Sequence, residues 1–117
     1  MNLEAKRGDL ETYTLTLKDA AGAALDLTGA SLWFTVKRGI SDADASAVFQ
    51  KTLGTGIVVA APLTGVAVIT VLAANTAALG DAAVTLLYDV QVKLADGSTK
   101  TPLSGEFRVT PDVTRAT

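Results

Sequence analysis

Residues 84–109 constrain the fold most strongly, because apolar and polar side chains alternate there on both sides of an Asp-Gly pair. The apolar residues before the pair share one parity: Val84, Leu86, Tyr88, Val90, Val92 and Leu94. Period-two alternation is typical of a strand with one buried face. Asp-Gly between two such runs is the strongest short signal of a β-hairpin. The sequence therefore predicts two antiparallel strands joined by a two-residue turn at Asp96-Gly97.

A two-residue turn also specifies which residues of the hairpin face each other. Ala95 would lie opposite Ser98, and the pairs on the core side would be Val92–Thr101, Val90–Leu103, Tyr88–Gly105, Leu86–Phe107 and Val84–Val109. The pairs on the outer side would be Asp89–Ser104, Leu87–Glu106 and Thr85–Arg108. A shift by one residue would destroy this match of apolar with apolar side chains. Pro102 has no N–H to donate, which predicts an edge, a bulge or an irregular start of the last strand.

Shorter extended stretches fill the rest of the chain. They are expected at 11–18, 25–29, 30–38, 48–53, 56–60 and 65–72, with one helical turn at most in 73–81, ended by Gly80. Both parities of 65–72 are apolar, which predicts a central strand covered on both faces. About seven or eight short strands with frequent turn signals are typical of an all-β, immunoglobulin-like antiparallel β-sandwich, with a small β-barrel as the alternative. We expect a single domain over residues 1–114 and a frayed tail at 115–117.

The composition excludes several classes of function. The 117-residue chain has no cysteine and no histidine, and therefore no disulfide, no thiolate metal ligand and no imidazole base. Its net charge is −2, from 10 basic and 12 acidic residues that are scattered along the chain without the basic patch that nucleic acid binding needs. No apolar run approaches the roughly 20 residues that span a bilayer, and the start shows no secretory signal. Neither nucleic acid nor a membrane is expected as a partner.

The loop at 39–46 places Asp42, Asp44 and Ser46 at alternate positions, as a calcium loop would. An EF-hand then needs glycine at its sixth position and glutamate at its twelfth. Ala47 and Leu53 stand there instead, so the EF-hand hypothesis fails. A solvated loop and a weak surface ion site near Asp42 and Asp44 both stay open, and no metal site is predicted.

Two glycine-containing motifs have a functional and a structural interpretation. Arg7-Gly8-Asp9 matches an integrin-binding tripeptide, but glycine followed by aspartate is also a natural turn between strands. The stretch 54–56 lacks the third glycine and the following helix of a phosphate cradle. Both motifs are therefore expected to form turns.

Catalytic carboxylates would have to come from Asp19, Asp26, Asp89 or Glu106. Asp89 and Glu106 fall on the outer face of the predicted hairpin, where solvated cross-strand partners are the ordinary explanation. A serine or threonine nucleophile would need lysine or a carboxylate as its base in a chain without histidine, and no spacing indicates one. The sequence therefore predicts a protein that is not an enzyme, with no catalytic residue and no cofactor.

Trp33 breaks the alternation of its own segment, because it falls on the polar face with Ser31, Thr35 and Lys37. A single large aromatic residue there is either covered by the segment 39–50 or exposed to a partner, and aromatic residues are enriched at binding hot spots. Leu87 lies on the outer face of its own strand and is a weaker signal of the same kind. Trp33 and Leu87 are the candidate interface residues.

Several stretches, taken together, resemble a family of phage proteins. They are 6–38, 56–71 and 88–114, with the "TAALG" turn between the last two. The most specific parts are "DLTGA" (26–30) followed by an alternating strand, and the ending "YDVQV…DG…LSGEFRVTPDVT". These parts resemble the N-terminal domain of the BppU-like upper baseplate proteins of tailed bacteriophages, and related small phage and prophage tail proteins.

The resemblance covers nearly the whole chain and implies an immunoglobulin-like β-sandwich that docks onto other tail or baseplate proteins. It also implies a place in the virion tail, after assembly in the cytoplasm of the bacterial host, and leaves a homo-oligomer open. The upper baseplate proteins continue into a stalk that carries the receptor-binding protein, whereas this sequence stops at Thr117, so we expect a small tail protein or an adaptor.

The alternative is an adhesin-like domain that binds carbohydrate or a host surface. Such sites combine aromatic side chains with polar groups in a groove. Tyr13, Phe34, Tyr88 and Phe107 point inward by parity, which leaves few aromatic residues for a groove and argues against this alternative.

Overall fold

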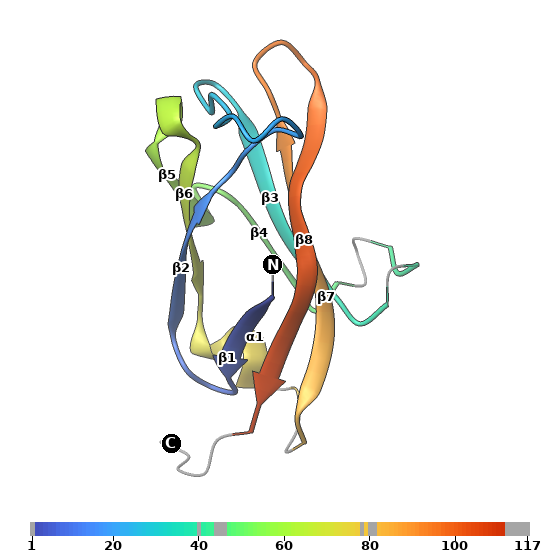
Figure 1. The fold of residues 1–117 in the computed structure, drawn as a ribbon. Helices are drawn as coiled ribbons and strands as arrows, with labels where there is room; N and C mark the ends of the chain where they lie inside the picture. The colour runs from blue at the N-terminus through green and yellow to red at the C-terminus, as the bar shows by residue number, and fades with distance from the viewer. Residues whose placement is uncertain (1, 40, 44–46, 78, 80–81, 112–117) are drawn as a thin grey trace.

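The chain is all-β, as its sequence predicts (Figure 1). The computed structural model describes residues 2–39, 41–43, 47–77, 79 and 82–111. The strands are β1 (Leu3–Lys6), β2 (Glu11–Thr16), β3 (Ser31–Lys37), β4 (Phe49–Leu53), β5 (Gly56–Ala61), β6 (Val66–Val71), β7 (Val84–Lys93) and β8 (Thr99–Thr110). A 3-10 turn, η2 (Pro62–Thr64), connects β5 to β6, and the short helix α1 (Ala73–Ala77) follows β6.

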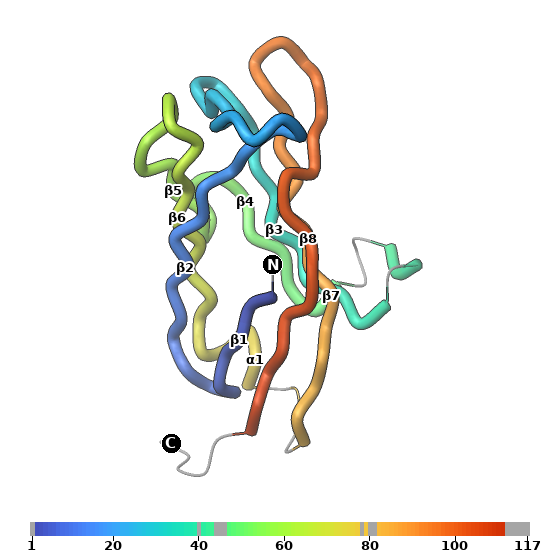
Figure 2. Tube along the Cα trace, viewed as in Figure 1, coloured from blue at the N-terminus to red at the C-terminus, as the bar shows by residue number. Residues whose placement is uncertain are grey.

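All the strands belong to one 8-stranded sheet in the order β1-β8-β7-β3-β4-β5-β6-β2. The sheet turns a corner between β4 and β5, which pair in parallel only at Thr52–Gly56 and Leu53–Ile57. One layer consists of β1, β8, β7, β3 and β4, and the other of β5, β6 and β2, so that the two layers enclose the core (Figure 2). The architecture is a β-sandwich nearly closed into a barrel, so that it has features of both predicted architectures. The sheet is mixed rather than purely antiparallel as predicted, because β1 pairs in parallel with β8 and β4 with β5.

The two edge strands of this sheet, β1 and β2, meet at a seam. The hydroxyl of Tyr13 on β2 donates a hydrogen bond to the carbonyl oxygen of Glu4 on β1 at 2.6 Å. Burial raises the pKa of Tyr13 to about 12, with help from the negative charges of Glu11 and Glu4. β1 pairs in parallel with the end of β8, from Leu3–Phe107 to Lys6–Thr110. It is not among the expected strands, because four residues are too few to show a period.

Aromatic side chains form the centre of the core. The ring of Phe34 lies 5.5 Å from that of Tyr88, 6.1 Å from that of Phe49 and 6.2 Å from that of Phe107. The ring of Tyr13 meets Phe107 edge to face at 6.0 Å. Pairs of this geometry are worth about 0.5–1.5 kcal/mol each beyond the area that they bury. The predicted inward parity of Tyr13, Phe34, Tyr88 and Phe107 is therefore confirmed.

The hairpin β7–β8 follows the predicted register along most of its length. Each expected pair from Val84–Val109 to Val90–Leu103 is present, including Tyr88 opposite Gly105. One face of each strand is apolar and the other is polar. Only this register turns the apolar side chains of both strands toward the core. Leu86 and Val90 are buried between the layers as a result.

The tip of the same hairpin differs from the prediction. Leu94 N–H bonds to Ser98 O and Gly97 N–H bonds to Leu94 O, so that the loop is 95–97 rather than the Asp-Gly pair alone. Gly97 has a φ of 90°, the left-handed conformation that such a loop requires at its last residue. Val92 consequently faces Lys100 instead of Thr101.

A bulge in β8 restores the predicted register below the tip. The register shifts between Val90 and Val92 of β7, opposite the stretch of β8 that contains Thr101 and Pro102. Proline cannot donate to the ladder and is tolerated at bulges. The bulge that Pro102 predicts is thus present, and it compensates for the longer loop.

β6 lies between β5 and β2, as a central strand should. Ala67, Ile69 and Val71 are buried, whereas Val66, Val68 and Thr70 on its other face are only half-buried. The prediction that both faces are covered is therefore wrong within the described chain, because a two-layered sheet covers only the inner face of each strand.

Two further expectations concern short segments. The stretch 25–29 forms no strand in the described residues; it crosses between the layers, with Leu25 N–H bonded to Leu17 O and Leu27 N–H to Pro62 O. The helical turn expected in 73–81 is present as α1, but its predicted end at Gly80 and the tail 115–117 lie outside the described residues.

Among the helices that the structure describes, none has the length and apolar character needed to cross a membrane.

Candidate interaction surface

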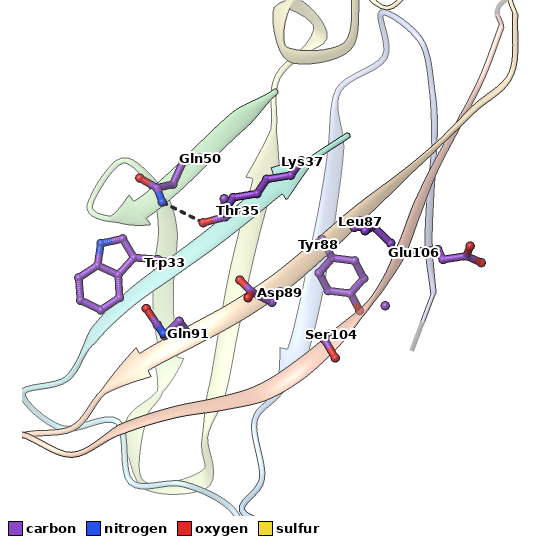
Figure 3. A pocket seen from close by; sticks show the side chains of 11 residues that line it. Trp33, Thr35, Lys37, Gln50, Leu87, Tyr88, Asp89, Gln91, Ser104 and Glu106 are labelled. Carbon is purple, nitrogen blue, oxygen red and sulfur yellow. Dashed lines mark hydrogen bonds between the residues drawn. The ribbon is translucent and has the colours of Figure 1, made fainter. Parts of the chain in front are cut away.

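The outer face of β4, β3, β7 and β8 is hollowed into a groove of about 710 Å³, which we call the outer groove (Figure 3). Its side chains come from the four strands in turn: Gln50 from β4; Trp33, Thr35 and Lys37 from β3; Leu87, Asp89 and Gln91 from β7; Ser104 and Glu106 from β8. Both candidate interface residues, Trp33 and Leu87, therefore lie on this surface.

The strand register arranges these side chains in rows across the groove. The rows are Thr52–Trp33–Gln91, then Gln50–Thr35–Asp89–Ser104, then Lys37–Leu87–Glu106. Trp33 stands in the first row and Leu87 in the last, so that a polar row separates the two apolar side chains. The groove thus offers an aromatic end, a polar middle and a mixed end with one cation, one anion and one leucine.

Trp33 is half-buried in the described chain. Gln50, which belongs to the segment 39–50, lines the groove with it, yet the indole is not enclosed (Figure 3). The choice between coverage by that segment and exposure to a partner stays a prediction, because residues 40 and 44–46 of the segment lie outside the described residues. Leu87 is 36% exposed. Partial burial holds a side chain in place while leaving apolar surface to contact.

Thr35 forms the floor of the middle row and is only 7% exposed. Its hydroxyl oxygen accepts a hydrogen bond from the side-chain amide of Gln50 at 2.8 Å. A buried hydroxyl is costly without such a partner. The bond also fixes the Gln50 amide at the side of the groove, where it can contact a ligand without losing further side-chain freedom.

The four candidate catalytic carboxylates fall into two groups: Asp89 and Glu106 line the outer groove, whereas Asp19 and Asp26 lie in turns outside it. Asp19 accepts hydrogen bonds at 3.0 Å from the N–H groups of Ala21 and Ala23, and Asp26 accepts one at 3.0 Å from that of Thr28. The hydrogen bonds from Thr28 lower the pKa of Asp26 below its ordinary value. These two carboxylates stabilise turns and do not line the outer groove that holds Asp89 and Glu106.

The tripeptide Arg7-Gly8-Asp9 forms a turn after β1, which confirms its structural interpretation. Asp9 N–H bonds to Lys6 O at 3.1 Å, and Gly8 has a φ of 79°. The N–H of Gly8 donates to the buried hydroxyl of Thr76 at 2.9 Å, and the guanidinium of Arg7 donates to the carbonyl of Ala77. The tripeptide therefore anchors the first turn of the chain to α1.

The other two motifs are also turns where they are described. Thr55 N–H bonds to Thr52 O at 2.9 Å, which closes the turn at 54–56 between β4 and β5. The carboxylate of Asp42 accepts a hydrogen bond from Gly39 N–H at 3.1 Å, while Asp44 and Ser46 lie outside the described residues. The described part of the chain holds no group of acidic side chains that could bind a metal ion.

A second exposed surface is not among the sequence-based candidates. It is the outer face of β5, β6 and β2, which we call the uncharged face, made of Val58, Ala60, Val66, Val68, Thr70, Thr12, Thr14 and Thr16. Val58 is 62% exposed. A signal for it does exist in the sequence, since residues 52–80 contain no Asp, Glu, Lys or Arg.

Comparisons with known proteins add little. No family model matches the chain, and no curated protein does. Two solved chains match, one of them the crystal structure of AggA, the major subunit of aggregative adherence fimbriae type I from Escherichia coli. It is 14% identical with a TM-score of 0.33, over 95% of this chain and 89% of that chain. A TM-score this low carries no argument, so any function must be inferred from the residues of the chain itself.

Proposed function

We propose that the chain is a non-enzymatic structural protein of a bacteriophage or prophage tail or baseplate, which docks onto other virion proteins through its outer groove. The observation that carries the proposal is the position of Trp33. The other aromatic side chains pack in or against the core, whereas Trp33 is half-buried at one end of a groove. Tryptophan at such a position is typical of a binding hot spot.

The stretches that resemble the phage proteins form the framework of this groove. "DLTGA" makes the turn before β3, with Gly29 at a φ of 69°, and β3 carries Trp33. The "YDVQV…LSGEFRV" ending forms the hairpin β7–β8, which carries Leu87. The likeness therefore supports the proposal through the strands that build the surface rather than through a binding motif.

Catalysis is no part of the proposal. The chain has neither histidine nor cysteine to act as base or nucleophile. Asp19 and Asp26 are engaged in turns, apart from the outer groove. Docking needs only a surface that excludes water around an anchor, and the groove provides one.

The test is whether the chain is a component of assembled tails. In a lysate of a phage or induced prophage that encodes it, tails purified by sedimentation should contain the chain, identified by mass spectrometry. Chains with Trp33→Ala should fold, by circular dichroism, yet be absent from tails. Trp33→Phe should keep partial incorporation, because it keeps a ring. Leu53→Ala removes another exposed apolar side chain, outside both the outer groove and the uncharged face, and should be incorporated normally. Tails without the wild-type chain, or with undiminished Trp33→Ala chain, would contradict the proposal.

Carbohydrate binding is a second candidate, because hydrogen-bonding groups flank the indole. Gln91 lies next to Trp33 across the strand pair, and Gln50 and Asp89 follow in the next row. Stacking of a sugar on an indole, with amides and a carboxylate beside it, is ordinary carbohydrate recognition. Trp33 is the only tryptophan of the chain, so its fluorescence reports directly on the groove. A glycan that shifts this emission, and no longer does so in Gln91→Ala, would favour this candidate over protein docking.

A further inference from the structure

The uncharged face differs from an ordinary outer face of a β-sheet. Solvated strands normally alternate apolar residues inside with polar and charged residues outside. Here the middle row reads Val58–Val68–Thr14 across β5, β6 and β2, and the neighbouring pairs are Val66–Thr16 and Thr70–Thr12. None of these residues carries a charge. Leucines continue the surface at its ends, with Leu63 on η2 74% exposed and Leu10 and Leu72 also exposed.

The sequence of β6 itself indicates that this face is meant to be covered. Both parities of 65–72 are apolar, a pattern typical of strands with two covered faces. Within the described chain the other layer covers only Ala67, Ile69 and Val71. On this face Val58 and Ala60 are exposed and Val66 and Val68 are half-buried. Apolar surface that is left uncovered by the chain's own layers marks interaction sites in soluble proteins.

We infer that the uncharged face is a self-association surface, covered by the same face of a second copy of the chain. The argument for a second copy is that the face matches itself electrostatically, since none of its described residues carries a charge. Two uncharged faces meet without repulsion and without the desolvation of any ammonium or carboxylate group. The outer groove contains Lys37, Asp89 and Glu106, so that a partner bound there would desolvate charged groups. The inference does not depend on the proposed function, since it uses the opposite outer face.

The geometry of β-sheets specifies how two such faces pack. Sheets stack about 10 Å apart with their strands roughly aligned, and valine and threonine side chains interdigitate between them. Two identical copies form an isologous contact, in which the centre of the patch meets its own counterpart. Val68 occupies that centre, in the middle of its row and on the middle strand of its layer.

The size of the face indicates a reversible contact. Three strands about 4.8 Å apart, each with six residues rising about 3.3 Å, cover roughly 300 Å². A standard interface buries about 800 Å² on each partner, so that the strands supply less than half of that area and the flanking leucines add to it. We therefore expect a concentration-dependent equilibrium between monomer and dimer rather than a permanent dimer.

The experiment is sedimentation equilibrium over a concentration series, with circular dichroism to verify folding. The wild-type chain should associate reversibly into dimers. Thr14→Glu and Val58→Glu should weaken the association by about tenfold or more, because each dimer would bury like charges in one contact. Thr85→Glu is the matched control: it makes the same change at an exposed threonine on the outer face of β7 and should leave the dissociation constant unchanged.

A charge-complementation test keeps the inference testable if a single variant also perturbs the fold. Val68→Lys and Val68→Glu should each be monomeric, and an equimolar mixture should recover association. A wild-type chain that stays monomeric at every concentration would overturn the inference, as would equal weakening by Thr85→Glu or no recovery in the mixture. Trp33→Ala should leave the dimer intact; if it abolishes the dimer, the outer groove is the self-interface and the inference is wrong, while docking through the groove would stand.

Discussion

The outer groove and the uncharged face lie on opposite outer sides of one sheet, yet they offer different chemistry to a partner. The outer groove is hollowed, with an indole at one end and charged side chains at the other. The uncharged face has only valine, alanine and threonine, and most of its residues come from a part of the chain without charge. Both arise from the same period-two pattern. The comparison teaches that the outward residues, rather than the fold, decide which chemistry a layer offers to a partner.

The comparison presumes that one core supports both faces, and Phe34→Ala tests this with the largest expected effect. Phe34 is fully buried on β3 and contacts rings from β4, β7 and β8. Its removal should lower the free energy of unfolding by about 3–5 kcal/mol, through lost burial and the cavity left behind. Urea denaturation should show one cooperative transition at a lower midpoint. Two separate transitions would mean that the layers are independent units.

Gly65→Ala, in the layer of the uncharged face, should lower the free energy of unfolding more than Gly97→Ala does in the other layer. Gly65 has a φ of 70° at the turn before β6, and an added Cβ would lie 2.5 Å from Leu17 O and 3.0 Å from Leu25 O. The clash adds to a left-handed strain of about 1–2 kcal/mol, so that thermal unfolding should occur at a clearly lower temperature.

Gly97→Ala is the control for that change, at the tip of the hairpin that builds the outer groove. Gly97 also has a positive φ, of 90°, but an added Cβ would meet nothing within 4 Å. Only the strain of about 1–2 kcal/mol should remain. Equal loss of stability in the two variants would show that the contacts of Gly65 with the backbone do not matter.

Tyr13→Phe probes the seam where the two layers meet, with the smallest expected effect. Loss of the hydrogen bond to Glu4 O should cost about 0.5–1.5 kcal/mol. Because the pKa of Tyr13 is raised to about 12, the unfolded chain ionises first, near pH 10, and the wild-type chain should lose stability as pH rises from about 10 to about 12.

The difference in stability between wild-type and Tyr13→Phe chains isolates this effect, because burial also raises the pKa of Tyr88 and lowers that of Lys51 in both chains. The difference should be constant below about pH 10 and should shrink above it. A difference that does not change with pH would show that Tyr13 ionises equally in the folded and unfolded chain.

Much of the fold could be predicted because strand patterns are local. Alternation placed β2, β3, β7 and β8 and assigned their inner and outer residues correctly, Trp33 and Leu87 included, except at the start of β8, where Lys100 rather than Thr101 faces Val92. The tip of the hairpin shows the limit: Asp96-Gly97 predicts a two-residue turn, but a longer loop formed and a bulge at Pro102 compensated for it. A local signal specified that a turn exists but not which of two similar turns the flanking strands accept.

By itself the sequence determined which residues face inward, since the parity of a strand follows from its own side chains and the cost of exposing apolar ones. Only the tertiary structure decided that β1 pairs with β8, that β4 and β5 turn the corner in parallel, and that Tyr13 bonds across the seam. The tertiary structure also decided that Gln50 and Thr35 form a hydrogen bond in the groove. It left the outer face of β6 uncovered by the other layer. These features depend on which distant segments meet when the sheet closes, and no local period encodes that choice.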